Sequence, residues 1–125
     1  MMKKIKDITI ILVDDDEVLL EMYKKKIGMS GFNILIAKNG KEGFKLMHNS
    51  NPNLMIIDLV MPSWDGFELY DRIRMENKVI PVVAFTNLSD TSDKQEALDK
   101  GFFDYWVKSD YTPAQIVSKI KKILN

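Results

Sequence analysis

Five short runs of apolar residues recur along the chain, separated by longer segments in which apolar and polar residues follow a helical spacing. The runs are rich in Ile, Val and aromatic residues, and most of them lack the apolar–polar alternation of a strand with one exposed face. Continuous apolar runs of this length are typical of strands that are buried on both faces, as in a parallel sheet. The predicted strands are Ile8–Val13, Phe32–Ala37, Leu54–Ile57, Val79–Phe85 and Tyr105–Val107.

The segments that follow these runs carry apolar residues three and four positions apart, which predicts a helix after each strand. Thr112, Pro113 and Gln115 form a predicted capping box with proline at the first helical position. Gly101 suits the left-handed residue that ends a helix, here the fourth. The spacing of a capping residue and an acid or amide three positions later recurs at Asn39, Asp65 and Ser92.

Five strands that alternate with five helices predict an α/β fold of the doubly wound, flavodoxin-like (βα)5 type. Its parallel sheet would have the strand order 2-1-3-4-5. The predicted elements use the whole chain, with no visible linker or repeat. We therefore expect a single domain over residues 1–125 and no output domain.

Charge and composition narrow the classes of function. Lys plus Arg equals Asp plus Glu at 18 each, and the zero net charge argues against nucleic acid as a general partner, which requires a basic excess. The chain has no cysteine, which excludes disulfides, thiolate metal sites and a cysteine nucleophile. The first apolar run is too short for a signal peptide and no stretch is long enough to span a membrane, so we expect a cytoplasmic protein without a membrane partner.

Polar residues follow four of the predicted strands. Burial of a polar side chain at such a position costs free energy unless the side chain takes part in a functional site. These polar residues are Asp14, Asp15 and Asp16 after the first strand, Asp58 after the third, Thr86 at the end of the fourth and Lys108 after the fifth. In a doubly wound sheet, the ligand crevice lies at the carboxyl ends of the strands where the strand order reverses. We therefore expect Asp14, Asp15 and Asp58 to converge, with Thr86 and Lys108 at the rim.

Three converging carboxylates repel one another unless a cation joins them, and Mg2+ is a hard cation that prefers oxygen ligands. A lysine and a threonine beside them suit the oxygens of a phosphoryl group. Aspartate is an accepted nucleophile in the formation of an acyl phosphate. The predicted chemistry is therefore a phosphoryl transfer that depends on positioning and charge neutralisation.

This ordered set of residues resembles the signature of the two-component response-regulator receiver domain over essentially the whole chain. The signature consists of Asp14-Asp15, Asp58 with Met61-Pro62 and Asp65-Gly66, Thr86, Tyr105 and Lys108. The resemblance implies a phosphoacceptor signalling protein that is not an enzyme, beyond catalysing its own phosphorylation and slow dephosphorylation. Asp58 would accept the phosphoryl group from a histidine kinase or a phosphotransfer protein. Asp15, Asp58 and the Val60 carbonyl would bind Mg2+ directly, and Asp14 would bind it through water.

The resemblance also implies a switch. Thr86 and Lys108 would hold phosphoryl oxygens, Thr86 would move toward the phosphate, and Tyr105 would turn inward with it. The face formed by the fourth helix, fifth strand and fifth helix would then be repacked for a downstream protein. A homodimer on phosphorylation is compatible with the resemblance, as are a diffusible output and an intermediate step in a phosphorelay.

Three features depart from the pattern of the family. Gly43 lies inside the second predicted helix, where alanine is common, and should weaken that helix by about 1 kcal/mol. Ser109 replaces the usual proline, so we expect a trans peptide bond there. Asn87 replaces a small residue, which would either narrow access to Asp58 or add a hydrogen bond to the phosphate. Val60 and Leu88 are apolar and cannot orient an attacking water, which predicts a long-lived phosphoryl-aspartate.

Other functions fit parts of the sequence. A phosphatase of the haloacid-dehalogenase type would use Asp14 as nucleophile and Asp16 as general acid, but it would leave Asp58 unexplained. A flavodoxin-like FMN carrier would need a phosphate loop rich in Ser, Thr and Gly in place of the three aspartates. A third alternative is a pseudo-receiver, which binds partners without being phosphorylated. The departures at Asn87 and Ser109 leave this alternative open.

Overall fold

Strands and helices alternate along the chain in the order predicted from the sequence. The computed structural model describes residues 4–125. The strands are β1 (Thr9–Val13), β2 (Asn33–Ala37), β3 (Leu54–Ile57), β4 (Val82–Thr86) and β5 (Asp104–Val107). The helices are α1 (Glu17–Met29), α2 (Gly40–Ser50), α3 (Gly66–Met75), α4 (Thr91–Lys100) and α5 (Pro113–Leu124), with short 3-10 helices η1 (Ile5–Asp7) and η2 (Lys108–Asp110).

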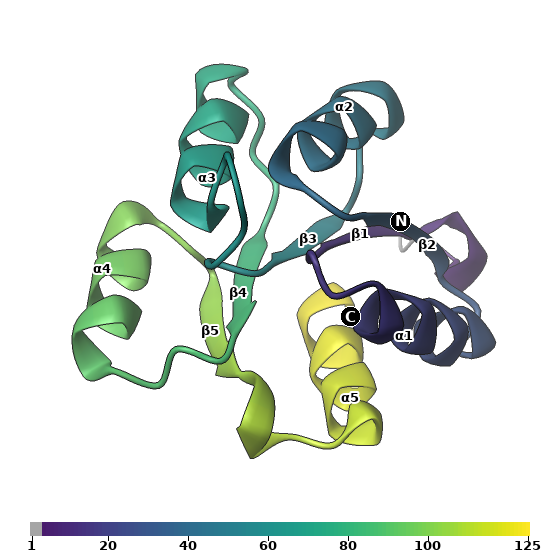
Figure 1. The fold of residues 1–125 in the computed structure, drawn as a ribbon. Coiled ribbons are helices and arrows are strands. Elements are labelled where there is room, and N and C mark those ends of the chain that lie inside the picture. The colour runs from purple at the N-terminus through teal and green to yellow at the C-terminus, as the bar shows by residue number, and fades with distance from the viewer. Residues whose placement is uncertain (1–3) are drawn as a thin grey trace.

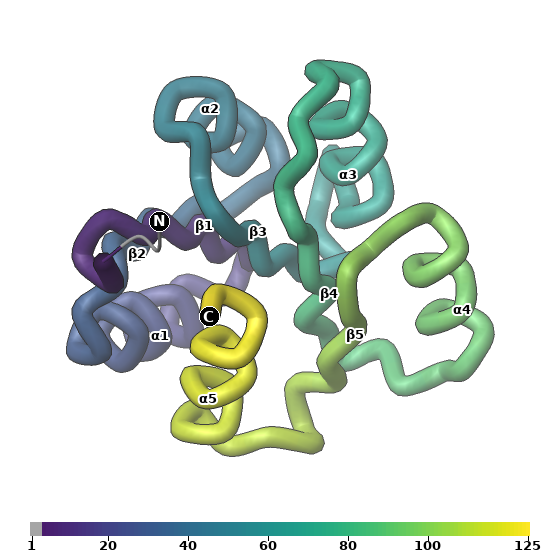
Figure 2. Tube along the Cα trace, turned by 180° about the vertical axis from the view of Figure 1, so that it is seen from behind, coloured from purple at the N-terminus to yellow at the C-terminus, as the bar shows by residue number. Residues whose placement is uncertain are grey.

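The sheet is parallel and has the order β2-β1-β3-β4-β5, which confirms the predicted topology. Val13 pairs with Ala37 on one side and with Ile57 on the other, so β1, β2 and β3 end at the same level. Helices α1 and α5 cover one face of the sheet, and α2, α3 and α4 cover the other (Figure 1). The view from behind shows α1 beside α5 (Figure 2).

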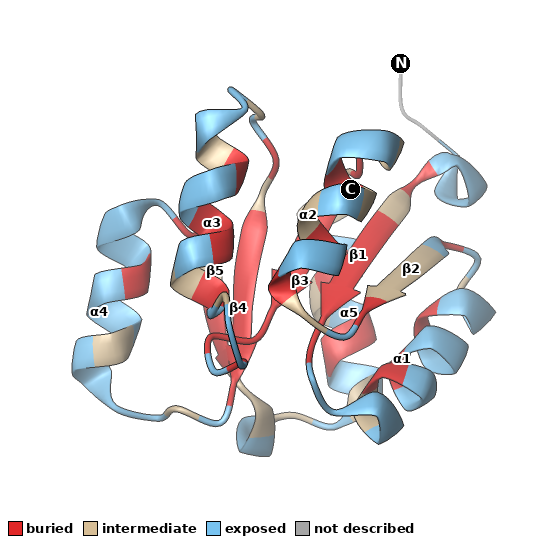
Figure 3. Ribbon diagram, turned by 45° about the horizontal axis from the view of Figure 1, so that its top comes forward, coloured by how far each residue is buried: buried red, intermediate tan, exposed pale blue. Residues whose placement is uncertain are grey.

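Each strand contributes to two hydrophobic cores, because successive side chains point to opposite faces of a sheet. Ile10 and Leu12 pack with buried residues of α1 and α5, whereas Ile11 and Val13 pack with those of α2 and α3. Strands β1, β3 and β4 are buried along most of their length, the edge strand β2 is mostly half-buried, and the outer sides of the helices are exposed (Figure 3). This explains why the runs in the sequence are continuous rather than alternating.

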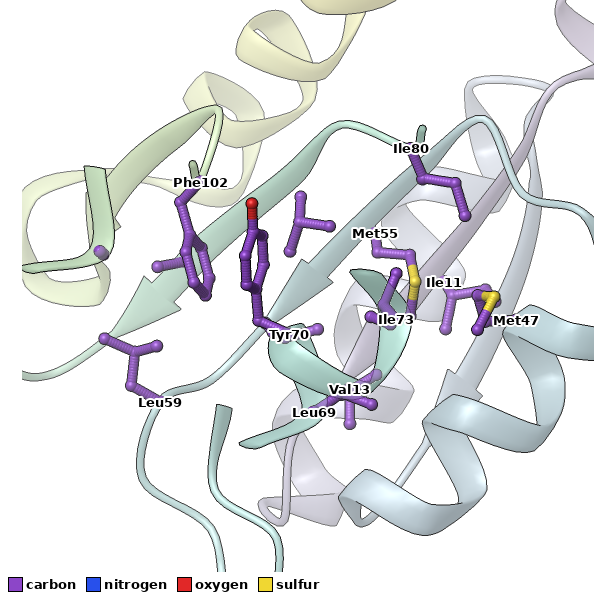
Figure 4. Packing of buried hydrophobic residues seen from close by; sticks show 14 of the residues in the cluster. Ile11, Val13, Met47, Met55, Leu59, Leu69, Tyr70, Ile73, Ile80 and Phe102 are labelled. Carbon is purple, nitrogen blue, oxygen red and sulfur yellow. The ribbon is translucent and has the colours of Figure 1, made fainter. Parts of the chain in front are cut away.

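The core beneath α3 contains a stack of two rings. Tyr70 lies against Phe102 with ring centroids 4.3 Å apart, and Figure 4 shows the two rings face to face beside the sheet. On the other side of the same core, Gly43 of α2 lies so close to β1 that a Cβ atom there would be 2.7 Å from Cγ2 of Val13. The absence of a side chain at Gly43 therefore allows α2 to approach the sheet.

Two local predictions differ from the structure. The fourth strand begins at Val82 rather than Val79, because Pro81 has no N–H to donate and Val79 is 98% exposed. The side chain that caps α4 belongs to Asp90, which accepts from the backbone N–H of Ser92, so the prediction of Ser92 as the cap was wrong. The capping box of Thr112 and Gln115 is present as predicted, and Gly101 has the left-handed conformation.

Candidate functional site

The first aspartates of the site are held by the turn between β1 and α1. Asp14 is fully buried, and its Oδ1 accepts a hydrogen bond of 2.9 Å from the backbone N–H of Asp16. Asp16 caps α1 by accepting from the N–H groups of Val18 and Leu19. Asp15 lies between them and is exposed. The turn therefore divides three adjacent carboxylates into a buried one, an accessible one and a helix cap.

Asp58 follows β3 directly and is 6% exposed. Its Oδ1 accepts from the backbone N–H of Val60 over 3.2 Å. Gly66, the first residue of α3, packs against this loop so closely that a Cβ atom would contact the Asp58 carbonyl oxygen and lie 2.7 Å from Cα of Leu59. A glycine is therefore required at the start of α3 to hold the β3–α3 loop in place.

Lys108 lies at the centre of the site rather than at its rim. Its Nζ is 2.6 Å from Oδ2 of Asp14 and 2.9 Å from Oδ2 of Asp58. Burial alone would lower the pKa of Lys108, but the hydrogen bonds and charges of the two carboxylates raise it above its ordinary value. Desolvation raises the pKa of Asp14, although Lys108 and the N–H of Asp16 oppose the rise. One ammonium group therefore neutralises part of a buried acidic cluster.

The same cluster has the donor set of a divalent-cation site. Carboxylate oxygens of Asp14, Asp15 and Asp58 all lie within 4.8 Å of one another. Oδ2 of Asp14 is buried, and Nζ of Lys108, 2.6 Å away, neutralises its charge. An all-oxygen donor set of this kind fits Mg2+, which takes one or two carboxylates together with water and phosphate.

Thr86 and Tyr105 are linked through the loop after β4. Thr86 is fully buried, and its Oγ1 accepts from the backbone N–H of Leu88 over 3.3 Å. The hydroxyl of Tyr105 donates to the carbonyl oxygen of Leu88 over 2.7 Å. Because a hydroxyl that accepts one bond can still donate its own hydrogen, Thr86 retains a donor for a ligand. Tyr105 is 5% exposed, so its side chain is buried in this structure.

The predicted site residues other than Tyr105 line one cleft of about 360 Å3, together with Asp16, Asn87 and Leu88. Asn87 is exposed and lines this cleft. The described residues contain no cis peptide bond, in agreement with the prediction for Ser109. Tyr105 contacts the loop behind the cleft rather than the cleft itself.

Sequence reasoning missed two aspects of the site. It placed Lys108 near the acidic residues but not between two of them, since the contact joins residues 50 positions apart. It also missed a second cleft that shares Asp15 and is lined by Lys38, Lys41 and Trp64. No local motif marks that cleft, because it forms only where three separate loops meet.

Comparison with known proteins identifies the family of the chain. The sequence profile of the family described as "Response regulator receiver domain" matches residues 10–121. "Probable transcriptional regulator ycf27" of Porphyridium aerugineum is 30% identical over 115 residues, which cover 92% of this chain and 47% of that protein. The alkaline phosphatase synthesis transcriptional regulatory protein PhoP of Bacillus subtilis is 28% identical and is covered to 48%. The chain thus spans about half the length of the curated relatives it matches.

Solved structures have the same fold. The receiver domain of the Francisella response regulator 1452 superposes with a TM-score of 0.85 at 28% identity, over 93% of this chain and 95% of that one. A receiver domain protein of Methanospirillum hungatei gives a TM-score of 0.86 at 26% identity, over 94% and 93% of the two chains. The chain therefore belongs to the response regulator receiver domain family of two-component signalling.

Proposed function

We propose that Asp58 is the residue that accepts the phosphoryl group. The observation that carries this proposal is the position of its carboxylate, which lies in an open cleft beside Asp14, Asp15 and Lys108 and is fixed by the N–H of Val60. An oxygen of Asp58 would attack the phosphorus of a phosphohistidine. The P–N bond would break, and the departing imidazole would take up a proton from solvent.

The neighbouring residues would stabilise the transferring group. Lys108 already lies 2.9 Å from Asp58 and supplies a fixed positive charge for a phosphoryl oxygen. Thr86 can donate its hydroxyl hydrogen to a second oxygen. Such prearranged charges and donors account for most of the catalysis in phosphoryl transfer.

A Mg2+ ion would be held by Asp15, Asp58 and the carbonyl of Val60, with Asp14 acting through water. Mg2+ would supply charge neutralisation for the attacking carboxylate and the incoming phosphoryl oxygens. Asp15 is the exposed member of the cluster. Its carboxylate would therefore release water molecules when it binds the ion. The buried Asp14 would orient the water molecules around it.

The output would be a change at the face made by α4, β5 and α5. The link from Thr86 through Leu88 to Tyr105 joins the cleft to β5 by two hydrogen bonds. A phosphoryl oxygen that draws Thr86 toward Asp58 would pull on this link and fix Tyr105 more firmly inside. Leu98 of α4 and Phe103, just before β5, are exposed and would offer apolar contacts to a downstream protein or to a second copy of the chain.

The partners that we propose are a histidine kinase or phosphotransfer protein as donor and a protein as target. Several relatives carry the name of transcriptional regulators, and these are proteins about twice as long as this chain. With 18 basic and 18 acidic residues, this chain itself has no excess of positive charge for binding nucleic acid. No helix within residues 4–125 is long and apolar enough to cross a membrane.

The geometry favours Asp58 over the phosphatase alternative. A phosphatase would need Asp14 as nucleophile and Asp16 as general acid. Asp14 has no exposed surface, and Asp16 is engaged as the cap of α1. Asp58 is the carboxylate that has both a fixed orientation and access to the cleft.

The test is to identify the aspartate that becomes modified. The protein would be incubated with Mg2+ and acetyl phosphate, the acyl phosphate would be trapped by borohydride reduction, and the modified peptide would be sequenced by mass spectrometry. Asp58→Asn, Asp14→Asn and, as a matched control, Asp16→Asn would be treated in parallel. Beryllofluoride with Mg2+, followed by amide NMR, would report the same site without covalent chemistry.

We expect modification at Asp58 in the wild type and in Asp16→Asn, and none in Asp58→Asn. The NMR shifts should include Thr86, Tyr105 and Lys108 in the wild type. Modification at Asp14 would instead support the phosphatase chemistry. A protein that neither becomes modified nor responds to beryllofluoride would be a receiver that acts through binding alone.

A further inference from the structure

A second cleft adjoins the acidic site on the side of α2. It has a volume of about 390 Å3 and lies between the β1–α1 turn, the start of α2 and the β3–α3 loop. This volume is within the range of sites for small molecules. Asp15 lines both clefts, so a ligand in the second one would lie beside the residue that is accessible to a metal ion.

Trp64 lines this cleft, and its indole ring is contacted by Lys41, Arg72 and Phe44. The Arg72 guanidinium covers the ring at 3.9 Å from its centroid and is itself bonded to Glu68 at 3.1 Å. Phe44 contacts Trp64 in a T-shaped arrangement at 6.0 Å. A Cβ atom on Gly40 would lie 2.8 Å from Cβ of Trp64. A fixed aromatic wall of this kind loses little conformational freedom when a flat group packs on it.

The charge of the cleft is positive. Lys38 and Lys41 line it, and neither has an ion-pair partner within the part of the chain that the structure describes. Asp15 is the single acidic lining residue. The lining therefore carries a net charge of about +1, which becomes more positive when a cation neutralises Asp15.

We infer that this cleft binds a small flat anion, such as an aromatic carboxylate, and that its occupancy is coupled to the metal site through Asp15. The ring of the ligand would pack against Trp64 and Pro62, and its carboxylate would lie between Lys38 and Lys41. A cation on Asp15 removes the repulsion between this residue and the ligand, so each would strengthen the binding of the other. The coupling rests on the proposed magnesium site, whereas the binding itself does not.

The probe is benzoate, followed by amide and indole NMR shifts of the full chain with Mg2+ or with a chelator. We expect a dissociation constant of the order of 1 mM with Mg2+, as is usual for a ligand of this size. Shifts should centre on Lys38, Lys41 and Trp64. Benzamide, which has the same ring without the charge, should bind more weakly, and the chelator should weaken benzoate several-fold.

The variants distinguish binding of benzoate in this cleft from a general attraction of benzoate to surface lysines. Lys38→Ala with Lys41→Ala should weaken benzoate by roughly three- to tenfold. Lys45→Ala removes an exposed lysine of the same helix that does not line the cleft, and it should leave binding unchanged. Equal loss in both variants, or shifts centred elsewhere, would overturn the site. Equal affinity with and without Mg2+ would overturn the coupling. Benzoate binding in a protein that fails the beryllofluoride test would refute the proposed phosphorylation and leave the cleft standing.

Discussion

At the scale of single residues, the main feature of the site is that three close carboxylates have only one positively charged side chain beside them. Lys108 contacts two carboxylates at once, and the third, Asp15, is left to solvent. The types and order of these residues could be predicted from the sequence, because a charged side chain at the end of a buried strand is costly unless it belongs to a site. The double contact of Lys108 could not, since it depends on the path of the loop after β5.

The hydroxyl of Tyr105 provides a test of the link to β5. Burial, followed by the charges of Asp93, Asp58 and Asp90, raises the pKa of Tyr105 to about 12. A pKa that is raised by folding gives stability that is present below pH 10 and is lost as the pH rises toward 12. Tyr105→Phe should lower the free energy of unfolding by about 1 kcal/mol at neutral pH, because it removes the bond to Leu88.

Urea unfolding of both proteins between pH 7 and 12 would measure this effect. The stability of the wild type should fall more steeply than that of Tyr105→Phe above pH 10, and the difference between them should shrink. Other titrating groups, including Tyr23, are common to both proteins and cancel. A constant difference across this range would mean that the Tyr105 hydroxyl is not protected from ionisation by the fold.

The lifetime of the phosphorylated state should depend on the mouth of the cleft. Val60 is 56% exposed and lines it together with Leu88. Neither side chain can hydrogen-bond a water molecule in line with the phosphorus, so we expect hydrolysis over minutes or longer. Val60→Asn would add such a group and shorten the lifetime several-fold, as measured by loss of phosphoprotein on phosphate-affinity gels. A wild-type half-life of seconds would contradict this expectation.

At the scale of elements, sequence patterns identified each strand and helix but not how closely they approach. The helix caps are local and were read from three or four residues, as at Thr112 and Gln115. Distances between elements depend on residues far apart in the chain. Gly43 illustrates this, because its sequence context suggests a weak point in α2, whereas the structure places it against Val13.

Replacing two helical glycines by alanine, one at a time, would distinguish the effect of helix propensity on stability from the effect of packing against the sheet. Gly28→Ala in α1 places Cβ 3.6 Å from Cγ2 of Ile34, an ordinary contact. We expect it to stabilise the protein by about 0.5–1 kcal/mol through helix propensity. Gly43→Ala gains the same propensity but meets Val13 at 2.7 Å, and overpacking of about 1–3 kcal/mol should outweigh the gain.

Thermal unfolding of the two variants against the wild type would distinguish the two effects. The expected result is a higher midpoint for Gly28→Ala and a lower one for Gly43→Ala. If both midpoints rise, α2 can move away from β1 at little cost and the close approach is not a constraint.

At the scale of the whole molecule, the topology could be predicted because continuous apolar strands and intervening helices leave few arrangements open. The second cleft could not be predicted, because it requires the relative positions of three loops. The proposed cation site consists of Asp14, Asp15 and Asp58, whose carboxylates come together only in the folded chain. Ions that bind only the folded chain shift its unfolding equilibrium.

Added Mg2+ should therefore raise the stability of the protein. At a concentration ten times its dissociation constant, the gain would be about 1.4 kcal/mol. Asp15→Asn should abolish this gain and should raise stability slightly in the absence of metal, because one of three close carboxylates is gone. Calorimetry with Mg2+ and with a chelator would measure both effects. An undiminished response to Mg2+ in Asp15→Asn would place the ion elsewhere.

The strand at the edge of the sheet has a consequence for how a signal can travel. Neighbouring residues of β5 belong to different cores, Tyr105 to the one under α4 and Trp106 to the one under α5. A slip of β5 by one residue would exchange these two large side chains between cores of different shape, so its register is locked from both faces. A conformational change at this edge of the sheet would therefore involve side chains and loops. The backbone of β5 that a partner contacts would stay the same.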